Sequence, residues 1–239
     1  MENISYVGLS QQMALQRRMD MTANNLANMN TPGFKSQNVL FLEYLNQSQQ
    51  GDQVRQVLDY ASYRDLTQGT FQQTFNELDL AIQEDGYFTV DTPEGRRYTK
   101  AGSFRLNENR EIVTKQGYPL LNESSAPIVV QAEATKITVT TGGEVVTDQG
   151  SVGRIHVVGF DNEQDMKAVG NNLYDAIQLQ EKPIENPGIT QGMIETSNVN
   201  PIIEMNKMIE ILRKYQATQR MLVTDHERIR SVIQKLTKA

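Results

Sequence analysis

The sequence predicts an α+β protein in which long N- and C-terminal helices pair as a coiled-coil-like domain, with an antiparallel β domain inserted between them. Apolar residues recur every three or four positions near both ends of the chain, which is typical of helices with a buried seam. Short alternating segments separated by turn residues lie between the helices, as expected for antiparallel strands. We assign residues 1–75 together with 188–239 to the helical domain and residues 76–187 to the β domain.

Composition excludes several classes of protein. The chain has 239 residues and a net charge of −6, and its basic residues are scattered, which argues against a nucleic-acid partner. It has no cysteine, so disulfides, thiolate metal sites and a cysteine nucleophile are impossible. No apolar run approaches the roughly 18 residues of a membrane span, so we expect no membrane insertion. The N-terminus lacks the cationic start of a cleaved signal peptide, which leaves export by a dedicated machine open.

The first predicted helix covers residues 4–29. Its main stripe, spaced by four and three residues in alternation, comprises Leu15, Met19, Thr22, Leu26 and Met29. A second stripe in the first half comprises Tyr6, Leu9 and Met13. The segment Thr31-Pro32-Gly33 ends the helix, because the residue before a proline avoids the α region and glycine permits positive φ.

The sequence does not assign one secondary structure to residues 36–75. Residues 39–42, Val-Leu-Phe-Leu, are compatible with a strand or a helix. Residues 46–53 are polar and rich in glutamine and asparagine, which favours a loop.

The middle of the chain predicts short strands joined by turns. The expected strands are residues 78–82, 87–90, 97–99, 103–106, 111–113, 136–140, 144–147 and 154–158. Gly142-Gly143 separates two of these strands and indicates a hairpin. We expect the β domain to close near Pro187-Gly188.

The last segment predicts a helix from about residue 201 to 236. Asn200 can cap it, Pro201 suits its first turn, and Glu204 complements the helix dipole. Its expected seam comprises Met205, Met208, Leu212, Tyr215, Gln219, Leu222, His226, Ile229, Ile233 and Leu236. The helix would be roughly 50 Å long, and its apolar burial alone cannot offset the entropy of ordering it. We expect the N-terminal helix to cover part of this seam and neighbouring subunits to cover the rest.

Four stretches resemble one family. They are Asn24-Asn25-Leu26-Ala27-Asn28 with Thr31-Pro32-Gly33-Phe34-Lys35, Leu78 to Phe88 with Tyr98 to Phe104, Gln116 to Leu121, and Gln191 to Asn200. In this order they are similar to the signatures of flagellar axial proteins, the rod and hook subunits. Two turns depart from the family pattern. Thr74-Phe75-Asn76-Glu77 replaces the usual Thr-Gly-Asn, and Asn109 to Val113 lacks a turn glycine.

The resemblance implies a structural subunit of the bacterial flagellar basal-body rod, built into a tubular helical stack. Terminal helices would form the inner layer and the β domain the outer layer, and together they would transmit torque. The implied partners are copies of the chain, other rod proteins and the flagellar type III export apparatus, with export into the periplasm without a cleaved signal peptide. The length favours a proximal-rod subunit, and a distal-rod or hook-type subunit is the alternative.

We expect the assembly interface to lie at the helix seams and in the signatures beside them. Its predicted members are Leu15, Met19, Asn24, Asn25, Leu26, Asn28, Thr31, Pro32, Gly33, Phe34, Ser197, Asn198, Asn200, Met205, Met208, Leu212, Tyr215, Leu222, Ile229 and Ile233. Asn24, Asn25, Asn28 and Asn30 crowd a helix end although asparagine is a poor helix former. They either bond neighbouring subunits and enforce register, or form a local cap and turn.

No catalytic residue, metal ligand or cofactor is expected. His156 and His226 are far apart in sequence and lack ligand spacing. Asp79, Glu84 and Asp85 fit the solvent face of a strand and its turn better than a catalytic carboxylate pair. An enzyme with an unrecognised site, or a coiled-coil adaptor whose β domain binds a ligand, remains a less favoured alternative to a rod subunit.

Overall fold

The computed structural model describes residues 2–47, 53–176 and 178–236, with side chains from 6 to 41, 61 to 176 and 178 to 236. Contacts between residues divide the chain into two units. Unit 1 is Met1–Met29, Ser36–Asp65 and Val199–Ala239, and unit 2 is Asn30–Lys35 and Leu66–Asn198. The expected β domain, residues 76–187, therefore lies wholly within unit 2, which extends further at both ends.

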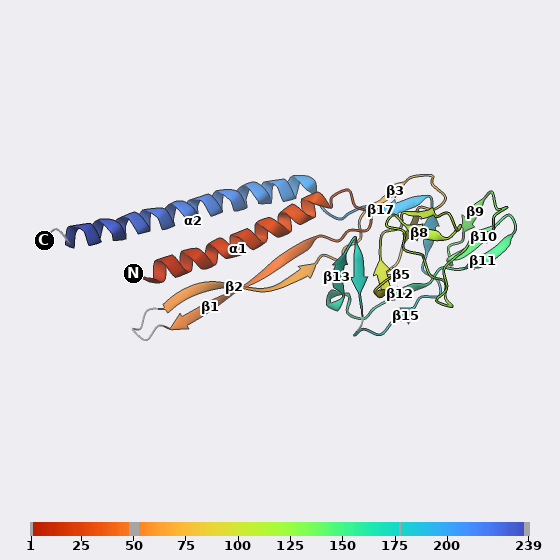
Figure 1. Cartoon of the computed structure of the whole chain (residues 1–239), viewed down its shortest axis with the longest axis horizontal. Helices are drawn as coiled ribbons and strands as arrows, with labels where there is room; N and C mark the ends of the chain where they lie inside the picture. The colour runs from red at the N-terminus through yellow and green to blue at the C-terminus, as the bar shows by residue number, and fades with distance from the viewer. Residues whose placement is uncertain (1, 48–52, 177, 237–239) are drawn as a thin grey trace. The chain divides into compact units, whose positions relative to one another are not determined.

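Unit 1 contains two helices and a long hairpin. Its elements are α1 (Glu2–Ala27), β1 (Gln37–Gln47), β2 (Gln53–Arg64) and α2 (Pro201–Leu236). The strands β1 and β2 pair antiparallel, with a bulge between Leu40 and Phe41. Helix α1 lies between α2 and the hairpin (Figure 1). Residues 39–42 are therefore strand, and most of the predicted loop at 46–53 falls on residues 48–52, outside the described part of the chain.

The bounds of α2 confirm the expected helix and its cap. The Asn200 side-chain oxygen accepts hydrogen bonds from the backbone N–H of Ile202 at 3.1 Å and of Ile203 at 3.3 Å. Pro201 is the first helical residue, where its missing N–H costs nothing. These bonds satisfy donors that a helix start otherwise leaves free.

The two helices run antiparallel. Gly8 faces Leu222, and a Cβ at Gly8 would lie 2.6 Å from Leu222 Cδ2, so the absence of a side chain allows the close approach. At the other end of the pair, the Asn25 amide donates to Glu204 Oε2 at 3.2 Å. The buried positions are Gly8, Leu15, Thr22 and Asn25 on α1 and Glu204, Ile211, Thr218 and Asp225 on α2. Their mostly seven-residue spacing gives each helix one packed stripe.

The predicted seam of α2 divides into a partly buried set and an exposed set. Met208, Tyr215, Leu222 and Ile229 are partly buried, as expected, whereas Met205, Leu212, Gln219, His226, Ile233 and Leu236 are exposed. Glu204, Ile211, Thr218 and Asp225 are buried instead, each one position before Met205, Leu212, Gln219 and His226 respectively. Three of those are polar but have local partners: Thr218 donates to the Lys214 carbonyl at 3.0 Å, and Asp225 and Glu204 pair with cations three residues later. The apolar periodicity therefore predicts a face adjacent to the most buried stripe, and its exposed members stay predicted contacts with neighbouring subunits.

Unit 2 is built from antiparallel strands. They are β3 (Phe71–Gln73), β4 (Leu80–Ile82), β5 (Tyr87–Thr92), β6 (Gly95–Thr99), β7 (Phe104–Leu106), β8 (Ile112–Thr114), β9 (Ile137–Val139), β10 (Glu144–Thr147), β11 (Gly150–Arg154), β12 (Val157–Gly159), β13 (Lys167–Gly170), β14 (Leu173–Asp175), β15 (Lys182–Pro183), β16 (Ile189–Gln191) and β17 (Met193–Glu195), with a 3₁₀ turn η1 (Glu163–Asp165). The largest sheet has the order β13-β14-β6-β5-β12-β15, and a second has the order β11-β10-β9. The remaining strands pair as β16-β4, β17-β3 and β7-β8.

Two expectations for this unit were wrong. The single strand predicted at 154–158 is broken into β11 and β12, because the N–H groups of Ile155 and His156 bond to Gly143 and Leu121 respectively. The unit also continues past Pro187-Gly188. Gly188 at φ +64° turns the chain without ending the β structure, and β16 and β17 follow.

The core of unit 2 consists of two clusters. The larger includes Leu80, Phe88, Ile112, Leu120, Val145 and Ile189. The smaller is aromatic, with Tyr87, Tyr98, Phe160 and Tyr174 meeting edge to face at centroid distances of 4.9–6.1 Å. Edge-to-face pairs add to the stabilisation that burial provides.

Both turns that depart from the family pattern contain a non-glycine residue at positive φ. Phe75 has φ 60° and Arg110 has φ 63°. The Arg110 guanidinium compensates by donating to the carbonyls of Gln131 and Ala134 at 2.8 and 3.0 Å. Phe75 has no such compensation, because its side chain is 81% exposed.

Candidate assembly interface

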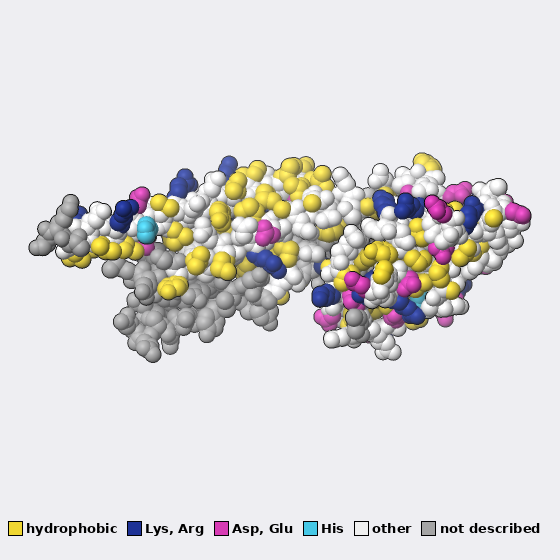
Figure 2. Space-filling view, viewed as in Figure 1, with side chains coloured by type: hydrophobic (Ala, Val, Ile, Leu, Met, Phe, Trp, Pro, Cys, Tyr) yellow, Lys and Arg dark blue, Asp and Glu magenta, His cyan; other side chains and the backbone are white. Residues whose placement is uncertain are grey.

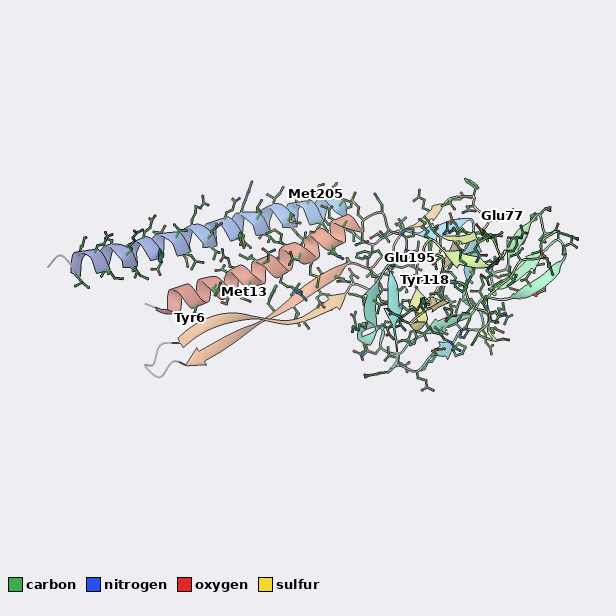
Figure 3. All side chains as sticks on the ribbon, in the orientation of Figure 1. Tyr6, Met13, Glu77, Tyr118, Glu195 and Met205 are labelled. Carbon is green, nitrogen blue, oxygen red and sulfur yellow. The ribbon has the colours of Figure 1, made fainter. Side chains whose placement is uncertain are left out.

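Helix α1 presents an apolar stripe that is more than half exposed within the described part of unit 1. Tyr6, Leu9 and Met13 are 59%, 52% and 66% exposed, and they follow the three- and four-residue spacing of one helix face. Tyr6 and Met13 project from α1 in Figure 3. This is the second stripe found in the sequence.

Helix α2 presents a longer apolar stripe of the same kind. Ile202, Met205, Ile209 and Leu212 succeed one another at three and four residues and are 43–68% exposed. Further exposed apolar residues on α2 are Ile203, Met221, Val223, Val232, Ile233 and Leu236. Figure 2 shows yellow side chains along the helical surface of unit 1. A contiguous exposed apolar surface of this kind marks an interaction site.

Asn25 connects three elements inside unit 1. Its side chain is 1% exposed. The amide nitrogen donates to the Gln37 carbonyl at 2.9 Å, the amide oxygen accepts from the Gln37 N–H at 2.8 Å, and a third bond reaches Glu204. Asn25 thus ties the end of α1 to the start of β1 and of α2. Because these bonds lie within one subunit, Asn25 can influence the register between subunits only by fixing the positions of these three elements.

The other asparagines of the cluster differ from Asn25. Asn28 donates from its backbone and side chain to the Asn24 carbonyl, at 3.1 and 3.0 Å, which is a local helix ending. Asn24 and Asn30 are exposed. Leu15 is buried, whereas Met19 and Leu26 are partly buried. Of the predicted interface residues on α1, Asn24 is therefore the one in the exposed class, and Met19 and Leu26 are partly exposed.

The two signatures around residues 31–35 and 191–198 meet in unit 2, in a cluster that we call the clasp: Gly33, Phe34, Lys35, Thr67, Gly69, Glu195 and Asn198. Gly33 has φ +67°, and a Cβ there would lie 2.4 Å from the Lys100 carbonyl oxygen, so only glycine fits. Its N–H donates to the Glu195 carbonyl at 2.8 Å, and the Asn198 N–H donates to the Phe34 carbonyl at 3.4 Å. Phe34 and Ser197 are buried beside these bonds.

A buried ion pair forms the centre of the clasp. Lys35 Nζ lies 2.8 Å from Glu195 Oε1, with side-chain exposures of 2% and 5%. Lys35 also donates to the Thr67 carbonyl at 2.8 Å, and the Gly69 N–H donates to Glu195 Oε1 at 2.9 Å. Burial lowers the pKa of Lys35, and the Glu195 carboxylate opposes that shift. The apolar spacing did not predict this pair, because two buried charged residues leave no periodic pattern in the sequence. The sequence feature that could have indicated it is that Lys35 and Glu195 each lie inside one of the two signatures.

Beside the clasp, unit 2 has a recess of about 250 Å³. Thr31 and Pro32 line it on one side, and the Pro32 carbonyl accepts a hydrogen bond from the Asn172 amide at 2.8 Å. None of the residues that line the recess carries a carboxylate.

The candidate catalytic residues are not brought together. Glu84 and Asp85 are exposed, as expected, but Asp79 is buried rather than on the solvent face. His156 is buried in unit 2, whereas His226 is exposed on α2 of unit 1. Within the described residues, no group of three His, Asp or Glu side chains is placed to hold a metal ion. The described helices also include none long and apolar enough to cross a membrane.

Comparison with known proteins defines the class. Residues 6–35 match the family model of flagella basal body rod proteins, and residues 190–235 match the C-terminal model of flagellar basal body rod FlgEFG proteins. Residues 81–147 match the D1 domain of flagellar hook proteins FlgE/F/G. The chain belongs to the flagellar basal-body rod protein family.

Relatives within this family cover the whole chain. It is 37% identical to the flagellar basal-body rod protein FlgF of Caulobacter vibrioides over 100% of this chain and 99% of the relative. It is 34% identical to FlgF of Mesorhizobium japonicum over 93% of this chain and 92% of the relative. It is 32% identical to the rod protein FlgG of Buchnera aphidicola from Acyrthosiphon pisum, over 98% and 97%. The chain is most similar to FlgF among these three.

Proposed function

We propose that this chain is a structural subunit of the proximal part of the flagellar basal-body rod. The observation that carries this is the pair of uncovered apolar stripes on α1 and α2, in a chain that matches rod proteins over its full length. Neighbouring subunits cover the stripes in the polymer, where coiled-coil-like packing continues from one subunit to the next.

The energetics favour coupling between ordering and assembly. Each apolar side chain contributes roughly 1.5–3 kcal/mol when it is fully buried. The first four residues of the α2 stripe are about half exposed, so much of that stabilisation becomes available only on assembly. In the unassembled subunit we therefore expect both helices to be weakly protected against hydrogen exchange.

This coupling suits export as an unfolded chain through the flagellar type III apparatus, with no cleaved signal peptide. The subunit then folds on joining the growing tip, in the periplasm. Hydrogen exchange on the purified subunit tests this proposal. We expect weak protection in residues 4–29 and 205–236, and strong protection there would contradict it.

Leu212→Glu tests the assembly stripe directly. The side chain is 43% exposed, so a carboxylate there leaves the subunit folded but places a charge in the proposed contact. We expect loss of rod incorporation and of motility with unchanged helix content by circular dichroism. Ala217→Glu, an exposed position on another face of α2, is the matched control and should support motility. Incorporation of Leu212→Glu at the parental level would overturn the proposal.

The position along the rod is a separate question, because relatives named FlgG also match the chain. Deletion of the gene tests it. Arrest of the basal body before the proximal rod is complete supports the proximal assignment, and arrest after that stage supports a distal one.

A further inference from the structure

Phe75 is the most exposed large apolar side chain in the described part of the molecule, at 81%. Its backbone is in the left-handed region, at φ 60°. A residue with a Cβ is disfavoured there, since the Cβ approaches the following carbonyl oxygen. The chain therefore holds an aromatic residue in a strained conformation from which the isolated subunit gains no burial.

The turn that carries Phe75 is well fixed. The Gly192 carbonyl accepts hydrogen bonds from the N–H of Thr74 at 2.8 Å and of Phe75 at 3.2 Å. Asn76 closes the turn, because its side-chain oxygen accepts from the Leu78 N–H at 3.4 Å. The phenyl ring is thus presented by an ordered turn next to Glu77, which Figure 3 labels. An aromatic group held ready in this way loses little entropy on binding and is typical of an interface anchor.

The recess beside the clasp has the size and chemistry to receive such a ring. It measures about 250 Å³, and a cavity of about 150 Å³ is enough for benzene. Pro32, Ala101 and Leu173 supply aliphatic surface, and Lys115 supplies a cation. Acidic residues outnumber basic ones in unit 2, so the net charges of two copies repel each other. The recess differs from this acidic average, because its lining has a lysine and no carboxylate. It therefore suits an aromatic anchor that has the carboxylate of Glu77 beside it.

We propose that Phe75 of one copy inserts into the recess between Pro32, Lys115 and Leu173 on unit 2 of a second copy. This contact rests on the proposed function, since it joins outer β units of subunits that the helices have already brought together. It adds to the affinity of the helical contact through the high effective concentration within the polymer.

Engineered cysteines test the pairing, because the chain has none of its own. Phe75→Cys and Gln116→Cys variants are co-expressed in cells that lack the native gene, and isolated basal bodies are oxidised. Gln116 lines the recess. We expect a disulfide-linked dimer that requires both variants and does not form in monomeric protein. Asp148→Cys, an exposed position of unit 2 outside the recess, replaces Gln116→Cys in the control. No dimer, or equal yield with the control, would overturn the pairing.

Phe75→Gly provides an independent measurement. Glycine accepts positive φ, so relief of strain should raise the folded-to-unfolded ratio of the monomer about two- to tenfold, after allowance for glycine's greater unfolded-state entropy. Incorporation into rods, measured in competition with the parent, should fall about tenfold because an anchor is lost. Val129→Ala, which trims another exposed apolar residue of unit 2, should change neither.

The results separate this proposal from the rod function. Parental incorporation of Phe75→Gly overturns the contact, whereas the rod function stands if Leu212→Glu still fails to incorporate. A Phe75→Gly monomer less stable than the parent would also overturn it, because Phe75 would then serve the fold of the subunit.

Discussion

Lys35 and Glu195 show how single residues fix the parts of the fold that bear the family signatures. Each is almost fully buried, and each makes hydrogen bonds beyond the ion pair itself. A buried charge without its partner retains its desolvation cost, so removal of one member is far more damaging than removal of both. The pair therefore specifies how residues 31–35 meet residues 195–198 inside unit 2.

Lys35→Met should destabilise unit 2 by about 3–5 kcal/mol, because it leaves the Glu195 carboxylate buried and without its cation. The double variant Lys35→Met with Glu195→Leu should recover most of that loss. Native-state hydrogen exchange of β5 and β6 measures the change within unit 2. Lys182→Met breaks the exposed pair with Asp161 and should cost at most about 1 kcal/mol. Equal losses for Lys35→Met and Lys182→Met would show that the clasp is not held by its charges.

We predict that His156 makes unit 2 sensitive to mild acid. Burial lowers the pKa of His156, with Glu181 opposing the shift and Arg96 adding to it. The unfolded chain, with a histidine pKa near 6.5, then binds more protons than the folded chain as the pH falls below about 6.5. The unfolding free energy of unit 2 should therefore fall from pH 7 toward the lowered pKa, and a hydrogen-exchange series in β5 and β12 should record it.

His156→Gln should flatten that dependence on pH. His226→Gln, at an exposed position on α2, is the control and should keep the slope of the parent. A parental slope in His156→Gln would assign the acid sensitivity to other groups.

Single residues were the level at which the sequence was least informative. The asparagine cluster stood out by composition, but nothing in its spacing indicated that Asn25 would be consumed by Gln37 and Glu204 while Asn24 stays exposed. Side-chain hydrogen bonds between distant segments leave no periodic trace. The absence of the usual turn glycine near Phe75 was visible in the sequence. The structure shows its consequence, because Phe75 adopts a positive φ that glycine would adopt without strain.

At the level of elements, the α1–α2 pair combines polar burial with apolar exposure. Its buried positions include Glu204, Thr218 and Asp225, whereas Met205, Ile209 and Leu212 are exposed. The limits of α2 could be predicted, since capping and heptad length are local properties. Its orientation could not, because the choice between adjacent faces depends on polar partners supplied by α1 and by neighbouring turns of α2. The hairpin β1–β2 was missed for a similar reason: its apolar run is too short to distinguish strand from helix.

Asn25→Ala should loosen unit 1 even in the monomer. It removes two bonds to the partly buried backbone of Gln37 and the buried bond to Glu204, at about 1–3 kcal/mol for each buried group left unsatisfied. Faster hydrogen exchange at the start of β1 and of α2 is the expected result. Asn24→Ala, an exposed neighbour, should leave exchange unchanged. If the two variants exchange alike, Asn25 does not hold these elements together.

At the scale of the whole molecule, the two units differ in how much of their apolar surface is buried. Unit 2 has two closed cores and is a complete β fold by itself. Unit 1 buries one stripe of each helix and leaves another exposed, as expected of a subunit whose stability depends on neighbours. The order of elements and the α+β class followed from the sequence, because helical and alternating patterns occupy separate parts of the chain.

The central claim is that the exposed stripes of α1 and α2 become buried when the subunit enters the rod. Methionine oxidation tests it with native residues, because susceptibility follows exposure. Met13 and Met205 lie in the stripes, at 66% and 46% exposed, and Met166 at 3% is the internal control. In the purified subunit, peroxide should oxidise Met13 and Met205 quickly and Met166 slowly. In isolated basal bodies Met13 and Met205 should react several-fold more slowly, whereas unchanged rates at both would contradict the account.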